Sequence, residues 1–142
     1  MLIAEILKDK GSDVFRAAPG DTLGDTARQL DEKRIGALVI CEGDRVVGIL
    51  SERDLVRAVA RDGQSALARP VSSYMTADVV FAEPTETVDT LMERMTDRRI
   101  RHLPVLQDKR LVGVVSIGDL VKTRIAEATF EAESMKAYIG AG

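Results

Sequence analysis

The sequence predicts a mixed α/β (α+β) fold made of two β-α-β-β-α units that pack with pseudo-twofold symmetry. Residues 14–57 and 79–122 align at a constant offset of 65 residues without a gap, and fourteen of the 44 aligned pairs are identical. The 142-residue chain is 45% hydrophobic but only 4% aromatic, without Trp. This length fits one compact domain or two small halves that share an aliphatic core.

Each unit is expected to open with a short extended segment, residues 14–16 in the first and 79–81 in the second. A proline follows, and then a threonine, Thr22 or Thr87, at a position suited to cap a helix. Apolar residues next recur at helical spacing in both copies. The first half of each unit is therefore predicted to be a strand followed by a helix.

A hairpin and a second helix are expected to complete each unit. The hairpin strands are residues 37–41 and 45–50 in the first copy, and 102–106 and 110–115 in the second. Their nearly continuous apolar runs, bounded by turn residues, are typical of strands buried on both faces. The closing helices are predicted over residues 52–61 and from residue 117 onward.

This interpretation divides the chain into five parts: an N-terminal segment (1–13), repeat 1 (14–60), a linker (61–78), repeat 2 (79–125) and a C-terminal helix (126–142). The last helix is predicted to carry one apolar face, made of Ile125, Ala128, Ala132, Met135 and Ile139. We expect this face to be an oligomer contact. The alternative, that it packs back on the chain's own core, has equal weight.

Composition excludes several classes of partner. The net charge of −3 and the isoelectric point near 5.2 argue against a nucleic-acid surface. No apolar run is long enough to span a membrane, and the N-terminus lacks the pattern of a signal peptide. Cys41 and His102 are the only residues of their kinds, so no metal is expected. These features predict a cytoplasmic protein without membrane or nucleic-acid partners.

The residues of chemical interest are Gly48-x-x-Ser51-x-x-Asp54 and its second copy, Gly113-x-x-Ser116-x-x-Asp119. Ser-x-x-Asp at a helix start is a capping box, which is the structural interpretation. The same geometry also suits a ligand, because a helix N-terminus attracts phosphate and a carboxylate in the first turn can accept bonds from a ribose diol. Two copies, each after a strand glycine, favour a site.

With this motif repeated in β-α-β-β-α order, the chain resembles a tandem pair of cystathionine β-synthase-type (CBS) domains from about Val14 to Lys122. The resemblance implies clefts between the repeats that bind AMP, ADP, ATP, S-adenosylmethionine or NAD. It implies that Asp54 and Asp119 hold ribose, with Ser51 and Ser116 beside them. It also implies that the start of the second strand of each unit lines the clefts: Ile35, Gly36 and Ala37, and Ile100, Arg101 and His102.

The two predicted clefts are unequal, because the repeats differ at the positions that would meet a phosphate. Arg101 and His102 can contact phosphate, whereas their counterparts Gly36 and Ala37 cannot. Within the motifs, Arg53 could reach a phosphate where Gly118 leaves space. Arg98 and Arg99 are instead interpreted as cations that favour a helix C-terminus.

These observations predict a regulatory sensor that binds an adenosine-containing ligand, most of all AMP, ADP or ATP. The alternatives are NAD or S-adenosylmethionine as ligand, or a ligand-free scaffold. The resemblance also implies a homodimer, and a sensor implies an unidentified protein target. Ser116, His102 and Asp119 are the residue types of a hydrolase triad, but the serine lacks a nucleophile elbow. No enzymatic activity is expected.

Overall fold

The computed structural model describes residues 1–11 and 14–141, which form two small sheets and a set of covering helices. Repeat 1 contains β1 (Arg16–Ala17), α2 (Leu23–Lys33), β2 (Ala37–Glu42), β3 (Arg45–Ser51) and α3 (Glu52–Asp62). Repeat 2 contains α4 (Val88–Arg98), β4 (His102–Gln107), β5 (Arg110–Ser116) and α5 (Ile117–Ala141). The predicted α+β class is confirmed, and both repeats contain a helix, a hairpin and a second helix in the same order.

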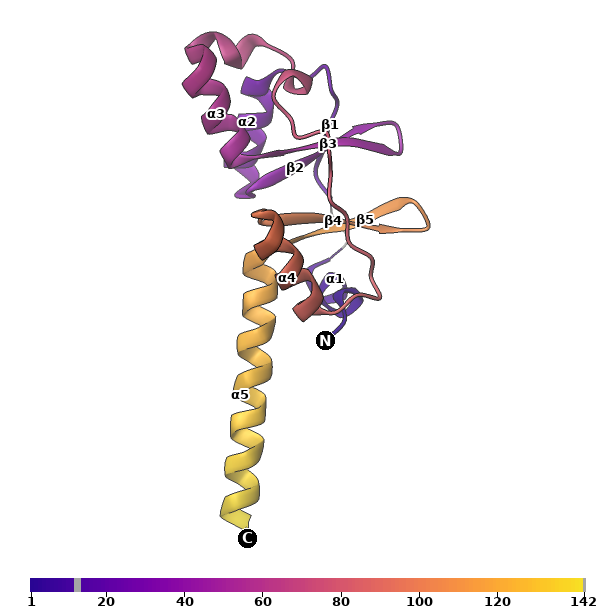
Figure 1. Ribbon diagram of the computed structural model, residues 1–142, viewed down its shortest axis with the longest axis vertical. Coiled ribbons are helices and arrows are strands. Elements are labelled where there is room, and N and C mark those ends of the chain that lie inside the picture. The colour runs from indigo at the N-terminus through magenta and orange to yellow at the C-terminus, as the bar shows by residue number, and fades with distance from the viewer. Residues whose placement is uncertain (12–13, 142) are drawn as a thin grey trace.

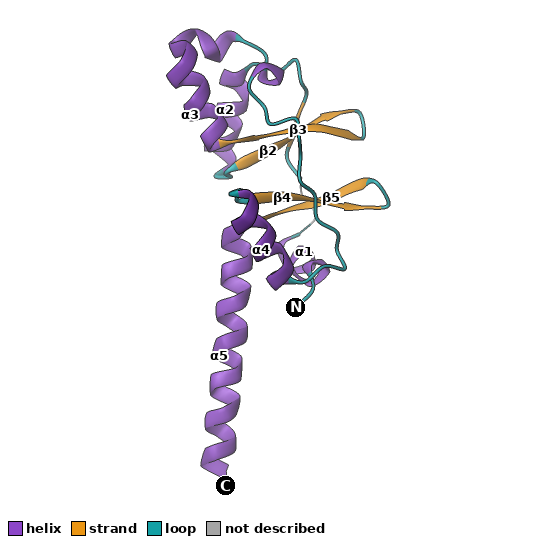
Figure 2. Ribbon diagram, in the orientation of Figure 1, coloured by secondary structure: helices purple, strands orange, loops and turns teal. Residues whose placement is uncertain are grey.

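The two hairpins face each other in the middle of the molecule, and helices cover their outer sides (Figures 1 and 2). In the first sheet β1 pairs with β2 in parallel and β2 pairs with β3 antiparallel, while β4 and β5 form the second sheet. Each sheet has its own aliphatic core, represented by Leu38 and Leu50 on one side and Leu103 and Val115 on the other. The boundary between the repeats therefore runs between the two hairpins.

The predicted first strand of repeat 2, residues 79–81, is absent from the structure. Only one isolated bridge forms, between Ala82 and Val105. The reason is Pro104, which occupies the position of Val39 and has no N–H to donate to a neighbouring strand. The prediction was wrong because it took no account of the proline in the strand with which this segment must pair.

Two segments outside the aligned repeats each pack on the repeat that does not directly follow them in the chain. Helix α1 (Ile3–Lys10), in the predicted N-terminal segment, buries Ile3 and Ile6 in the core of repeat 2. The predicted linker forms the 3-10 helices η1 (Gly63–Ala68) and η2 (Val71–Ser73), and Val71 is buried in the core of repeat 1. Each of these covering segments thus precedes one repeat in the chain and packs on the other.

Backbone hydrogen bonds show that the two covering segments are equivalent. The amide of Ile3 donates to Glu86 at 2.9 Å, and the amide of Val71 donates to Asp21 at 2.7 Å. Asp21 and Glu86 are 65 residues apart, whereas Ile3 and Val71 are 68 apart. The covering segments therefore belong to the same pseudo-twofold arrangement, at a shifted offset.

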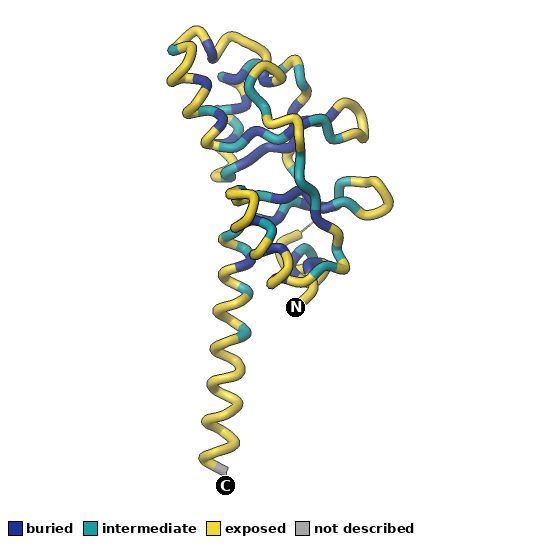
Figure 3. The backbone as a smooth tube through the Cα atoms, in the orientation of Figure 1, coloured by how far each residue is buried: buried dark blue, intermediate teal, exposed yellow. Residues whose placement is uncertain are grey.

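Helix α5 leaves the body of the molecule after its first turns and projects away from it (Figure 1). Leu120 is buried, but residues 126–140 are exposed apart from the half-buried Glu127 (Figure 3). Packing of the C-terminal helix on the chain's own core, the alternative left open by the sequence, is therefore wrong. None of the described helices combines the length and apolarity that a bilayer crossing requires.

Candidate functional site

Both Ser-x-x-Asp motifs form capping boxes at the strand-to-helix turns. Ser51 is the N-cap of α3: its hydroxyl accepts from the Asp54 amide, and the Asp54 carboxylate accepts from the Ser51 amide at 2.9 Å. In repeat 2 the Ser116 hydroxyl accepts from the Asp119 amide at 3.1 Å, and the Ser116 amide donates back to Asp119 at 2.9 Å. The structural interpretation of the motif is thus correct at both sites.

The strand glycines of the motif accommodate the covering segments. A Cβ atom on Gly113 would lie 2.5 Å from a methyl carbon of Leu7 in α1, and one on Gly48 would lie 3.1 Å from the carbonyl oxygen of Thr76. Thr76 and Ile49 exchange two backbone hydrogen bonds at this crossing. The predicted close approach is therefore made by the chain itself.

A cleft of about 290 Å³ lies between the two repeats. Seven of the twelve predicted site residues line it: Gly36, Ser51, Arg53, Asp54, Ile100, Arg101 and His102. The cleft combines the motif of repeat 1 with the strand start of repeat 2, as pseudo-twofold packing requires. The other five predicted residues do not line it: Ile35, Ala37, Ser116, Gly118 and Asp119.

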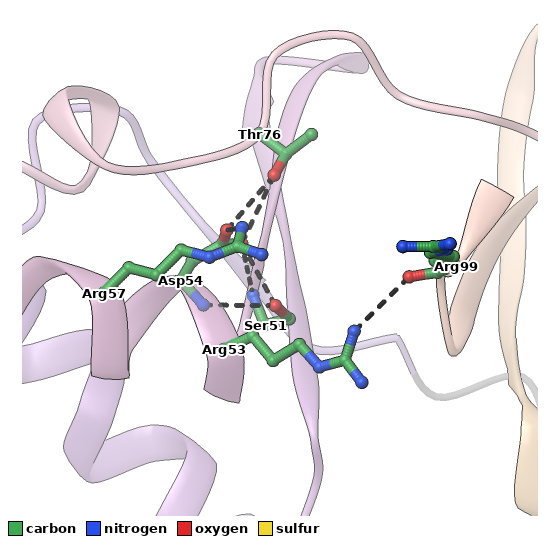
Figure 4. Close-up of polar contacts among 6 residues, drawn as sticks. All are labelled: Ser51, Arg53, Asp54, Arg57, Thr76 and Arg99. Carbon is green, nitrogen blue, oxygen red and sulfur yellow. Dashed lines mark hydrogen bonds and ion pairs between the residues drawn. The ribbon is translucent and has the colours of Figure 1, made fainter.

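Asp54 is the buried carboxylate of this cleft, with 7% of its surface exposed. Besides the Ser51 amide, it accepts from the Thr76 hydroxyl at 3.3 and 3.4 Å and lies 4.0 Å from a guanidinium nitrogen of Arg57 (Figure 4). The Thr76 bonds are near the upper limit for a hydroxyl donor, so they are weak. A ligand hydroxyl could take the place of Thr76 at little cost.

The cleft is lined by more cationic than acidic side chains. Four arginines line the cleft, together with three acidic residues, Glu52, Asp54 and Asp78. The Arg53 side chain extends from α3 toward the opposite repeat, where its guanidinium donates to the carbonyl oxygen of Arg99 at 3.5 Å (Figure 4). This charge distribution offers several donors to an anionic group that enters between the repeats.

His102 fills the space that Gly36 leaves open in the opposite repeat. A Cβ atom at Gly36 would lie 2.8 Å from the His102 Nε2 atom. Burial lowers the pKa of His102 and is the largest influence on it, although the charge of Glu52 acts in the opposite direction. The imidazole is therefore neutral at pH 7, so its part in a phosphate contact would be that of a single N–H donor.

Sequence reasoning missed several lining residues. Arg99 was interpreted as a helix-terminal cation; it does cap α4, in a left-handed conformation, but it also lines the cleft. Arg57 follows Asp54 by three residues and aligns with the cation Lys122, a signal that could have revealed it. Thr76 and Asp78 come from the segment between the repeats, which the duplicated pattern does not cover, and Val80 comes from the predicted first strand of repeat 2.

Comparison with known proteins identifies the family. The sequence matches the family model of the CBS domain twice, over residues 4–61 and 71–125. A CBS-domain containing protein of Agrobacterium tumefaciens has the same fold, with a TM-score of 0.85 and 43% sequence identity over 87% of this chain and 99% of that protein.

Two other similar structures contain adenosine compounds. A CBS domain protein of Pyrobaculum aerophilum, complexed with AMP, is 28% identical with a TM-score of 0.75 over 84% of this chain and 89% of its own. The CBS domain pair of protein MJ0100, in complex with 5-methylthioadenosine and S-adenosyl-L-methionine, is 26% identical with a TM-score of 0.79 over 89% of this chain and 98% of its own. From its two family matches and these shared folds, the chain belongs to the CBS domain family and carries two copies of the domain in tandem.

Proposed function

We propose that the cleft between the repeats binds an adenine nucleotide, AMP, ADP or ATP, and that the protein is a regulatory module rather than an enzyme. The observation that carries this proposal is the buried Asp54 carboxylate in a cleft that also holds four arginines. A carboxylate accepts from a ribose diol, and guanidinium groups donate to phosphate. Stand-alone CBS pairs are typically regulatory, and the AMP complex of a relative supports the ligand class.

The cleft is suited to all three parts of a nucleotide. Its lining includes apolar side chains that suit a flat base, among them Ile49, Val80 and Ile100. Asp54 and Ser51 lie at the helix N-terminus, where the free amide end of α3 also favours negative charge. Its volume of about 290 Å³ is at the lower end of the range for small-molecule sites.

Two other ligands have to be weighed against this proposal. S-adenosylmethionine is bound by the MJ0100 pair, but its sulfonium is cationic and would face the arginines of this cleft. NAD carries phosphates and suits the charge, but it is larger than the cleft volume favours. A ligand-free scaffold would account for the capping role of Asp54 but not for the four arginines that line the same cleft.

Binding in the cleft would couple the two repeats, because its walls come from both. A ligand can shift their packing only by as much as its affinities for two arrangements differ. We propose that an unidentified protein partner reads this shift. We also propose that the protein is a homodimer and that α5 contributes to the contact, since its large apolar side chains, such as Ile139 at 71% exposure, are uncovered.

Calorimetric titration and thermal unfolding with AMP, ADP, ATP, NAD, S-adenosylmethionine and adenosine test the ligand. A ligand at 100 times its Kd adds about 2.7 kcal/mol of stability. Asp54→Asn should abolish nucleotide binding, whereas Asp119→Asn, the same change at the same motif position of repeat 2, should not. Binding of S-adenosylmethionine or NAD alone would establish the alternative, and the absence of any ligand effect would leave the scaffold.

A further inference from the structure

The carboxylate of the second motif is already occupied by a cation from another part of the chain. The Nζ atom of Lys10, in the last turn of α1, lies 2.6 Å from Oδ2 of Asp119 and donates to the carbonyl oxygen of Val114 at 2.9 Å. Asp119 is the counterpart of Asp54, so an ammonium group lies against the carboxylate that the second motif would offer to a ribose hydroxyl.

In repeat 1 the two equivalent acceptors receive hydrogen bonds from a threonine, Thr76. The Thr76 amide donates to the Ile49 carbonyl at 2.9 Å, and its hydroxyl donates to Asp54 at 3.3 and 3.4 Å. Ile49 and Val114 are equivalent at the offset of 65. One ammonium group in repeat 2 therefore replaces an amide and a hydroxyl in repeat 1.

The two arrangements differ in how readily a ligand can replace them. The Thr76 hydroxyl is a neutral donor, and its hydrogen bonds to the Asp54 carboxylate are long. The hydrogen bond from Lys10 to Asp119 is short and charge-assisted. Burial acts most strongly on the pKa of Asp119 and would raise it, but the Lys10 hydrogen bond and the Ser116 amide outweigh it and the pKa falls below its usual value. A neutral ribose hydroxyl cannot supply the positive charge that displacement of Lys10 removes.

We propose that Lys10 determines which of the two motifs takes the ligand: it closes Asp119 to nucleotides, so that each chain binds one, at Asp54. This inference rests on the proposed function. It assigns a role in ligand selection to α1, which lies outside the aligned repeats.

The test is the number of AMP molecules bound per chain, measured by calorimetric titration. Wild type should bind one and Lys10→Ala two, with the second lost again in the double variant Lys10→Ala/Asp119→Asn. Lys10→Arg, which keeps the cation, and Lys8→Ala, which removes an exposed lysine of the same helix, should both bind one. Two molecules on wild type, one on Lys10→Ala, or weaker binding at the Asp54 site of Lys10→Ala would overturn the inference.

A measurement without ligand separates this inference from the proposed function. If AMP binds neither wild type nor Lys10→Ala, the proposed function fails for AMP. The urea midpoints of Lys10→Ala, Asp119→Asn and the double variant then test the pairing on its own. Non-additive midpoints would support Lys10 as the occupant of the second motif, and additive midpoints would refute it.

Discussion

At the residue scale, His102 connects the chemistry of the cleft to pH. It is the only histidine of the chain and comes from the start of β4, where it packs against Gly36 of the opposite repeat. Burial disfavours the charged form of the imidazole, so protonation of His102 opposes its packing in the folded state. The contact between the repeats therefore carries a proton linkage that can be measured.

We predict that acidification below about pH 6.5 destabilises the protein through His102. The pKa of His102 is lowered in the folded state, mainly by burial, so the unfolded chain binds the proton first and the free energy of unfolding falls as pH falls. One such group contributes at most about 1.4 kcal/mol per pH unit. Urea unfolding of wild type and His102→Gln at pH 7.5, 6.5 and 5.5 measures the difference. Parallel pH profiles for the two proteins would contradict the prediction.

At the scale of elements, α5 consists of two parts in different environments. Its first turns carry the capping box of Ser116 and Asp119 and bury Leu120 in repeat 2, whereas residues 126–140 project into solvent. The spacing of Ile125, Ala128, Ala132, Met135 and Ile139 alternates between three and four residues, which is the pattern of a seam between packed helices. Burial against a second copy would cover this seam.

We predict that Ile139→Lys weakens the proposed homodimer and that Phe130→Lys does not. Both side chains are 71% exposed, but they stand nine residues apart and therefore on opposite sides of the helix. Light scattering coupled to size-exclusion chromatography gives the mass at graded concentrations. Since both residues are on the surface, the unfolding free energy of the monomer should change by less than about 0.5 kcal/mol. Equal effects of the two changes on mass would show that the predicted face is not the contact.

At the scale of the whole molecule, the sequence predicted the elements that the two repeats share and missed the covering segments that pack on them. The hairpins, α2, α3 and both capping boxes follow from local pattern. The covering segments do not, since none of the ten residue pairs between 1–10 and 69–78 is identical and their equivalence lies in backbone hydrogen bonds. Thr76 and Lys10, which meet the two motif carboxylates, come from these segments. Sequence alone therefore could not predict which side chains meet the two motif carboxylates.

This exchange of covering segments predicts how the chain can be cut. Fragments 14–78 and 1–65 have equal length and both contain repeat 1 entire. Only 14–78 keeps Ala66, Val71 and Met75, which complete the core of repeat 1, while 1–65 carries α1 without the repeat that buries Ile3 and Ile6. A domain of this size is marginally stable, so the loss of its cover should decide whether it folds. Fragment 14–78 should show dispersed amide NMR signals and a cooperative urea transition, and fragment 1–65 should show neither. If 1–65 were the more stable fragment, the assignment of η1 and η2 to repeat 1 would be wrong.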